Sequence, residues 1–271
     1  MTASPSFDLD TYLYRIGFRG DRTNTLATLA AVQRGQATSI PFENLDPWLR
    51  RPVALDIASV QRKLVHEGRG GFCFEHNLLL GQALRALGFT VQDLSARVRW
   101  NTPDDTPRPR THMVLVVTIG VQRYLVDTGF GGHTLTGPLR LDRRSPQATP
   151  HGSVRVQYAD GVYTPQVELQ GEWRALYSFD LQPQRPPDYE MACWYICNHP
   201  ASIFVTTLMA ARPLADGRLA LRNRELTFYG LDGRIEAETL PSPDAVCEVL
   251  AARFGIRLDG LAPALAASLE N

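Results

Sequence analysis

The first ninety residues carry apolar side chains at the spacing of amphipathic helices. Four such segments follow one another, and a glycine comes shortly after each of them, at positions 17, 35, 68 and 88. Glycine is common just past a helix end because it adopts the left-handed conformation without strain. Asp56 is a further boundary signal, since an aspartate side chain can cap the helix that follows it. The pattern predicts a bundle of short helices near residues 9–16, 26–34, 57–67 and 73–87.

From residue 90 onward the apolar positions follow the patterns of β-strands. Gly120-Val121 and Asp160-Gly161 each separate two strand segments by two residues, which is typical of tight hairpins. Antiparallel strands joined by tight turns favour a barrel or a strongly curved sheet. The strands are predicted at residues 91–98, 111–119, 122–127, 154–158, 162–169 and 173–179.

The last third of the chain mixes the two periodicities, so the protein as a whole is predicted to be α+β. Turn and capping residues mark the ends of the elements here, as they do in the helical and strand-rich parts of the chain. The predicted elements are a helix at residues 188–198, strands at 225–229 and 234–240, and a final helix between Ser242 and Gly255.

Composition excludes several classes of partner. The 271 residues carry 28 basic and 28 acidic side chains, with no basic block, which argues against nucleic acid or an anionic membrane as a partner. The first residues lack the pattern of a secretory signal, and no apolar run reaches the length of a membrane span. Four cysteines without framework spacing favour free thiols in a reducing cytoplasm. Lys63 is the only lysine, which we interpret as compositional bias.

Cys73 is the strongest candidate for chemistry. It follows Gly70-Gly71 and opens a strongly helical segment, so its thiol is expected in the first helical turn. There the helix macrodipole favours the thiolate, and unpaired N–H groups can receive an oxyanion. The alternative is a small, inert core residue, which is the commoner fate of a lone cysteine.

A thiol nucleophile needs a base and a third group that holds the base in one tautomer. His112 begins the strand before the Gly120-Val121 turn, and Asp127 ends the strand after it. If these two strands form a hairpin, the imidazole and the carboxylate become cross-strand neighbours. Cys73, His112 and Asp127 are therefore the candidate nucleophile, base and orienting group.

Other roles for these residues stay open at this point. His112 can be a strand-end histidine bound to a carbonyl, and Asp127 can be a turn-forming aspartate. His76, one turn from Cys73, is a rival base without an obvious carboxylate partner, and His133 is a weaker rival.

The residues after Asp127 form a glycine-rich turn, Gly129-Phe130-Gly131-Gly132. It lacks the pattern of a Walker loop and of a dinucleotide fingerprint. Such a turn lets backbone N–H groups approach a coenzyme's phosphates or pantetheine, although an ordinary turn explains it equally well.

Cys193, Cys197 and His199 invite comparison with a zinc site. Only three candidate ligands cluster there, on what looks like an apolar helix, so no metal is predicted.

Several motifs in the same order resemble the arylamine N-acetyltransferases, over residues 8–210. That family combines a helical bundle, a β-barrel and an α/β lid on a cysteine-protease-like core, which implies divisions at residues 1–90, 91–187 and 188–271. The resemblance also implies a Cys73–His112–Asp127 triad. The motifs are Ile40-Pro41-Phe42-Glu43-Asn44-Leu45, Arg69-Gly70-Gly71-Phe72-Cys73-Phe74-Glu75-His76-Asn77, Thr111-His112-Met113, Val126-Asp127-Thr128-Gly129-Phe130-Gly131-Gly132, Trp194-Tyr195 and His199-Pro200-Ala201-Ser202-Ile203-Phe204.

The same resemblance implies roles for residues around the triad. Val98, Phe130 and Phe204 are expected to line an acceptor pocket, and Gly129 and Gly131 to lie near coenzyme A. Glu43 and Arg69 look like the family's buried ion pair. The approach to the histidine, Pro107-Arg108-Pro109-Arg110, is variable in sequence, so the coenzyme contacts there are left open.

The function that the resemblance implies is acetyl transfer from acetyl-CoA, a co-substrate, to arylamines or arylhydrazines. The expected route is ping-pong, through acetyl-Cys73. A thiol hydrolase or a transglutaminase-like enzyme shares the same Cys-His-Asp order and is the alternative, and a non-catalytic binding module is a third reading. The oligomeric state is left open.

Overall fold

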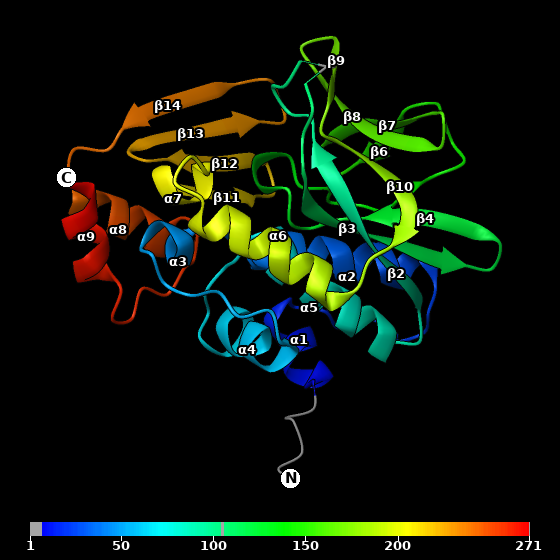
Figure 1. Ribbon diagram of the computed structural model, residues 1–271, viewed down its shortest axis with the longest axis horizontal. Helices are drawn as coiled ribbons and strands as arrows, with labels where there is room; N and C mark the ends of the chain where they lie inside the picture. Colours follow the sequence, from blue (N-terminus) through cyan, green and yellow to red (C-terminus); the bar gives the residue numbers. More distant parts are fainter. Residues whose placement is uncertain (1–6, 104–105, 271) are drawn as a thin grey trace.

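Two antiparallel sheets and a group of helices make up the protein (Figure 1). The computed structural model describes residues 7–103 and 106–270. Helices gather below the two sheets in this view, the barrel-like sheet lies to one side and the smaller sheet to the other. The predicted α+β class is confirmed, whereas the division of the chain at residues 90 and 187 stays a prediction. No helix in the described part of the chain is long and apolar enough to cross a membrane.

The first part of the chain is helical, as predicted. Asp8, Thr25 and Asp56 each cap a helix and accept a hydrogen bond from the backbone N–H three residues on. The helix that starts at Asp56 passes into a π-helical turn before Gly68. The helices are α1 (Leu9–Arg15), α2 (Leu26–Ser39), α3 (Leu45–Trp48), α4 (Ile57–Gln61), η1 (Arg62–His66) and α5 (Cys73–Ala86).

Gly35 does not end its helix, which corrects the prediction for that segment. α2 continues through it to Ser39. A Cβ atom at Gly35 would lie 2.9 Å from the carbonyl oxygen of Ile16, at the end of α1. The glycine therefore serves close packing between two helices, and a sequence pattern cannot distinguish that use from a helix stop.

A nine-stranded antiparallel sheet curves into the barrel that the turns predicted. Its strand order is β5-β4-β3-β2-β10-β8-β7-β6, and β9 pairs with β8. The strands are β2 (Thr90–Val98), β3 (Arg110–Ile119), β4 (Gln122–Val126), β5 (Leu139–Arg140), β6 (Gln147–Thr149), β7 (Gly152–Ala159), β8 (Val162–Leu169), β9 (Glu172–Ala175) and β10 (Tyr177–Pro183).

The single strand predicted at residues 173–179 is wrong. The structure divides it at Leu176 into β9, which folds back on β8, and β10, which also pairs with β2. Leu176 is buried, and its carbonyl oxygen accepts hydrogen bonds from the backbone N–H groups of Arg99 and Trp100. Apolar residues stand at positions 173, 175, 177 and 179, on both sides of this point, so the sequence gives no sign of the change of partner strand.

The smaller sheet draws on both ends of the chain. Its order is β1-β11-β12-β13-β14, so a short strand from the helical part forms one edge. The hairpin at residues 225–239 and the helices at 186–198 and 243–252 correspond to predicted elements, whereas β1, β11, β12 and the helices at 203–206 and 262–269 were not predicted. The elements are β1 (Phe42–Glu43), α6 (Pro186–Asn198), α7 (Ile203–Thr206), β11 (Met209–Pro213), β12 (Gly217–Arg222), β13 (Glu225–Gly230), β14 (Ile235–Thr239), α8 (Pro243–Ala252) and α9 (Ala262–Leu269).

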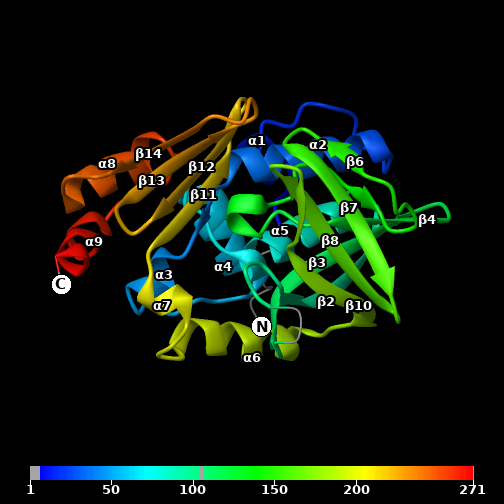
Figure 2. The same ribbon diagram turned by 90° about the horizontal axis from the view of Figure 1, so that it is seen from above.

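The C-terminal helices pack on the smaller sheet (Figure 2). Leu265 of α9 and Leu250 of α8 belong to the apolar cluster that also holds Leu219 and Leu226 of the sheet. Packing α9 against α8 fixes the last helix on that sheet.

α5 joins the helices to the barrel. Its buried residues Leu80 and Leu84 share one apolar cluster with Leu115 and Val117 of β3. Gln36 of α2 reinforces the junction by donating hydrogen bonds to the carbonyl oxygen of His76 and to Thr128 Oγ1. The first turn of α5 is therefore held against both the helices and the barrel.

Alanine substitutions at two helical glycines should have opposite effects on stability. Gly35→Ala should destabilise the protein by about 1–3 kcal/mol because its Cβ meets rigid backbone. Gly81→Ala in α5 should be neutral or stabilising by up to about 1 kcal/mol, since its nearest neighbour is the mobile end of Arg85. Urea unfolding of both variants checks this, and equal effects would contradict the packing role of Gly35.

Candidate active site

Cys73 is the first residue of α5, as the sequence predicted. Phe72 precedes the helix with extended backbone angles, and Cys73 is only 3% exposed. The sulfur lies 3.7 Å from the carbonyl oxygen of Thr111 at the start of β3. The thiol thus lies at the positive end of the helix, directly beside the strand that carries His112.

His112 and Asp127 meet inside the protein. His112 Nε2 lies 2.8 Å from Asp127 Oδ2, and both side chains are almost fully buried. Leu115 of β3 pairs with Val126 of β4. Continued by one residue, this register places Asp127 opposite Val114, and His112 is two residues before Val114 on the same face of β3. The two side chains are diagonal cross-strand neighbours, which confirms the proximity that the hairpin predicted.

Burial and the neighbours Asp127 and Cys73 have opposite effects on the pKa of His112. Burial lowers the pKa of His112, but the negative charge of Asp127, its hydrogen bond and a hydrogen bond with Cys73 outweigh this and raise the pKa to about 10. Burial raises the pKa of Asp127, yet the pairing with His112 and hydrogen bonds from Asn77 and Gly129 leave it below its usual range. The pair is therefore a buried imidazolium–carboxylate pair. With Nε2 bonded to Asp127, Nδ1 is the ring nitrogen left for the sulfur.

Asn77 and the backbone of Gly129 fix the second oxygen of Asp127. Asp127 Oδ1 accepts a hydrogen bond of 2.9 Å from Asn77 Nδ2 and one of 2.8 Å from the Gly129 N–H. Asn77 Nδ2 also donates to the carbonyl oxygen of Met113, and its Oδ1 accepts from the Thr128 N–H. One asparagine, a turn beyond Cys73, thus ties α5 to both ends of the hairpin. In the sequence, Asn77 is part of a family motif, but no role was predicted for it.

Gly129 lies directly under the nucleophile. A Cβ atom there would come within 2.5 Å of the Cys73 Cα atom. The sequence interpretation placed this glycine near a coenzyme. The structure adds an independent steric reason for it, because no larger residue lets the loop approach α5 so closely.

Aromatic rings surround the histidine and the mouth of the site. The ring of Phe130 lies 5.1 Å from that of His112, the ring of Tyr177 lies 4.8 Å from it, and the two rings also contact each other. Val98, at the end of β2, pairs with Tyr177 of β10. Phe204 packs its ring 5.2 Å from Phe72, the residue before the nucleophile. Val98, Phe130 and Phe204 thus come from three elements that border the Cys73 region.

The rival bases lie in different surroundings. His76 is fully buried, its Nε2 lies 3.1 Å from the carbonyl oxygen of Pro41, and burial lowers its pKa to about 4. His133 packs on Trp100, with ring centroids 4.2 Å apart, and burial with Arg218 nearby lowers its pKa to about 4. Of these three histidines, the carboxylate of Asp127 pairs with His112.

The three residues considered for zinc do not form a metal site. In the described part of the chain, no group of three or more His, Cys, Asp or Glu side chains is placed to hold a metal ion. His199 Nδ1 accepts a hydrogen bond from the Ala201 N–H instead.

Comparisons with known proteins agree with this geometry. Residues 25–262 match the model of a family described as N-acetyltransferase. The arylamine N-acetyltransferase of Mycolicibacterium smegmatis is 44% identical over 95% of this chain and 94% of its own length, and that of Escherichia coli K12 is 37% identical over 93% and 89%. The chain belongs to the arylamine N-acetyltransferase family.

Solved structures of family members share the whole fold. The arylamine N-acetyltransferase from Mycobacterium tuberculosis superposes with a TM-score of 0.94 at 39% identity, covering 97% of this chain and 100% of that one. The Mycobacterium marinum structure in complex with CoA gives a TM-score of 0.93 at 38% identity, covering 97% and 98%. The similarity to arylamine N-acetyltransferase enzymes therefore covers nearly the whole chain, and the chain is an enzyme of this family.

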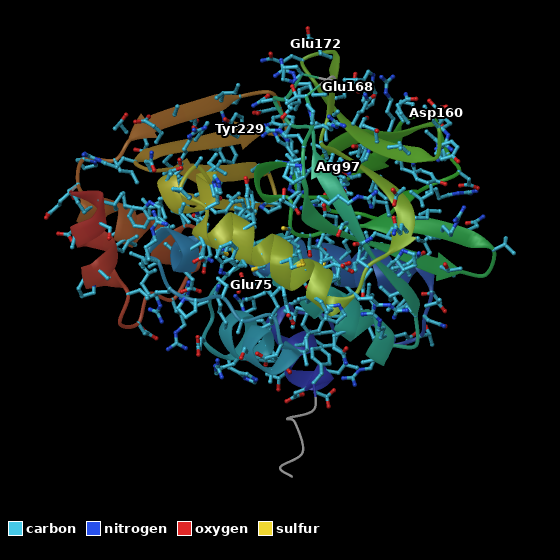
Figure 3. The ribbon with its side chains drawn as sticks, in the orientation of Figure 1. Glu75, Arg97, Asp160, Glu168, Glu172 and Tyr229 are labelled. Carbon is cyan, nitrogen blue, oxygen red and sulfur yellow. The ribbon has the colours of Figure 1, made fainter. Side chains whose placement is uncertain are left out.

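In this family member a buried network of charges underlies the start of α5. Glu43 and Arg69 form the expected pair, with Glu43 Oε1 2.7 Å from an Arg69 guanidinium nitrogen. Lys63 Nζ lies 2.7 Å from both Asp46 and Glu75. Figure 3 shows Glu75 toward the middle of the molecule, whereas labelled acidic residues of the β8–β9 hairpin lie at its outer edge. The one lysine of the chain is therefore a structural residue, which composition alone did not reveal.

Glu75 connects this network to the nucleophile. While one carboxylate oxygen binds Lys63, the other accepts a hydrogen bond from the Phe72 N–H, directly before Cys73. Gly71 leaves room for this, since a Cβ there would lie 2.6 Å from Glu75 Oε2. A glutamate at the third position of a helix is a known capping signal, and it could have been read from the sequence.

Removing the lysine charge should destabilise the enzyme strongly. Lys63→Met keeps the length of the side chain but removes the cation that pairs with the buried carboxylate of Glu75, at an expected cost of about 3–5 kcal/mol. Arg257→Ala is the control, because its pair with Asp259 is exposed and should contribute about 1 kcal/mol or less. Denaturant unfolding compares the two, and a small loss for Lys63→Met would show that the network is not stabilising.

Stability should also fall with rising pH through the His112 pair. The folded pKa of about 10 lies above the ordinary value of 6.5, so the folded protein holds this proton more tightly than the unfolded chain. The contribution is fully present below pH 6.5 and is lost as the pH rises toward 10. The difference in unfolding free energy between the unaltered enzyme and His112→Gln should shrink across this range. A constant difference would mean that the imidazole is not charged in the folded state.

Proposed function

We propose that the enzyme acetylates arylamines and arylhydrazines with acetyl-CoA as donor, through an acetyl-Cys73 intermediate. The observation that carries this proposal is the buried His112–Asp127 pair, 2.8 Å apart, beside a cysteine at a helix N-terminus. This arrangement provides a nucleophile, a base and an orienting group in one place. The names of the relatives support the acceptor class, and the CoA complex of the Mycobacterium marinum relative supports the donor.

In the first half-reaction Cys73 takes the acetyl group. His112 already holds the proton as an imidazolium, so the Cys73 thiolate beside Nδ1 attacks the carbonyl carbon of the thioester. The bond from that carbon to the coenzyme's sulfur breaks, and the imidazolium returns the proton to the departing thiolate. One thioester replaces another, so the step is close to thermoneutral.

In the second half-reaction the amine nitrogen attacks the carbonyl carbon of acetyl-Cys73. His112 accepts the proton that the nitrogen loses, and the bond from carbon to Cys73 Sγ breaks. The sulfur regains its place beside the imidazolium. The new amide is more stable than the thioester, so this half-reaction drives the cycle forward.

Preorganised charge supports both half-reactions. The charge and hydrogen bond of His112, with the hydrogen bonds from Asn77 and the Gly129 N–H, keep Asp127 ionised, so it stabilises the imidazolium without taking the proton. Backbone N–H groups in the first turn of α5 face the oxyanion that forms on the carbonyl.

The rings around the site suit a flat acceptor. An aromatic amine is weakly basic and neutral at pH 7, so it enters an apolar pocket without desolvating a charge. We assign Phe130, Phe204 and Val98 to this pocket, and the turn at Gly129 and Gly131 to the coenzyme.

Mass spectrometry of the intact protein tests the intermediate. Incubation with acetyl-CoA and no acceptor should add one acetyl group, on Cys73, and an arylamine should then remove it as the acetylated amine. Cys73→Ala should stay folded, gain no acetyl group and lose all turnover. An acetyl group on another residue, or none, would exclude the mechanism, and release of the group by water alone would indicate a thiol hydrolase.

Alkylation kinetics test the base. His112→Gln should slow the reaction of Cys73 with iodoacetamide at neutral pH, and should slow acetyl transfer by about 10²–10⁴-fold. Cys247, which is not part of the site, provides an internal reference for alkylation in the same sample. Unchanged alkylation of Cys73 would remove His112 from its role.

A further inference from the structure

Two cysteines of α6 lie in contact, in the same apolar cluster as Cys73. Cys193 and Cys197 are one helical turn apart, on the same face of the helix, and their sulfur atoms are 3.8 Å apart. Both are free thiols and both are buried, at 4% and 8% exposure. The mechanism uses neither of them.

The pair offers two sulfur ligands and no third. No group of three potential metal ligands occurs in the described residues, and His199, the nearest candidate in sequence, uses Nδ1 as a hydrogen-bond acceptor for Ala201. A structural zinc ion requires four protein ligands, so this pair cannot hold one. The geometry suits an atom that binds two adjacent sulfur atoms and already carries its third substituent, so that it needs no other protein ligand.

We propose that Cys193 and Cys197 form a binding site for trivalent organoarsenicals of the type R–As(OH)2. Pyramidal arsenic(III) has bond angles near a right angle, so its two sulfur ligands lie side by side, as they do here, and not at opposite ends of a line. The organic group occupies the third position. No further protein ligand is required.

The reaction conserves atoms and involves no redox change. Each thiol proton leaves with one hydroxyl of the arsenical as water, and two arsenic–sulfur bonds replace two arsenic–oxygen bonds. The products are R–As(S-Cys)2 and two molecules of water. Because the hydroxyl carries the proton away, the thiols need not ionise first.

The surroundings favour this chemistry over alkylation. The neighbouring thiol and burial raise the pKa of Cys193, which suppresses reactions that need a free thiolate. Tyr189 and Ile196, from the same helix, belong to the same apolar cluster as the two cysteines. A dry, apolar environment of this kind protects arsenic–sulfur bonds from exchange with water.

The position of α6 gives a route to the pair. The helix runs along the outside of the molecule, next to α7 (Figure 2). Its outer face carries the exposed side chains of Met191 and Trp194, and Cys197 lies in its last turn. Local opening of this turn exposes Cys197 and lets arsenic bridge to Cys193.

The test uses the full chain carrying Cys73→Ala, so that its result does not depend on the proposed acetyl transfer. Methylarsonous acid, the smallest member of the class, should add one CH3As group per chain with the loss of two hydrogens. The adduct should survive an excess of 2-mercaptoethanol, a monothiol, and should be removed by the dithiol 2,3-dimercaptopropanol. Peptide mapping should place it on the segment that contains residues 193 and 197.

Single substitutions identify the ligands. In the Cys73→Ala chain, Cys193→Ala or Cys197→Ala should reduce the adduct that survives the monothiol by at least tenfold, whereas Cys247→Ala, which alters the other free cysteine, should retain it. Thermal unfolding confirms that each variant is folded. Should one variant fail to fold, the mapping on the Cys73→Ala chain still decides the question. Absence of a monothiol-resistant adduct there, or its location at Cys247, would overturn the proposal.

Discussion

The carboxylate of Asp127 is fully buried, and the geometry of the site follows from the need to compensate its charge. An ionised carboxylate without partners in the protein interior costs several kcal/mol. Here one oxygen binds His112 and the other binds Asn77 and the Gly129 N–H. These partners come from β3, α5 and the loop after β4, so one charge fixes three segments against one another. The same bonds that stabilise the charge also set the orientation of the imidazole.

A second buried set of charges holds the other side of the nucleophile. Lys63 and Arg69 neutralise most of the charge on Glu43, Asp46 and Glu75, and Glu75 binds the N–H directly before Cys73. Breaking one partner of such a network leaves a buried charge, and the cost is large beside a total stability of roughly 5–15 kcal/mol. The start of α5 is therefore fixed from two sides, by Asn77 through Asp127 and by Glu75 through Lys63. This rigidity keeps the sulfur beside the imidazole ring that holds its proton.

The sequence was most informative where chemistry depends on local spacing. Cys73 after two glycines at a helix start, and His112 and Asp127 on either side of a two-residue turn, are local patterns, and the hairpin register converts the second into a contact. The motifs around these residues identified the family. Patterns failed where one residue type serves two purposes. Gly35 packs two helices together and does not end one. The apolar residues at positions 173, 175, 177 and 179 look like one strand and conceal a change of partner strand at Leu176.

By itself, the sequence determined the α+β class, most of the helices and strands, and the three residues of the candidate triad, because these depend on periodicity, turn chemistry and short separations along the chain. Only the tertiary structure decided what lies around them. In the folded protein Lys63 pairs with Asp46 and Glu75, and Asn77 donates a hydrogen bond to Asp127. β1, from the helical part of the chain, forms an edge of the smaller sheet. The partners of a buried charge or of an edge strand depend on which distant segments pack together, and the sequence pattern does not show this.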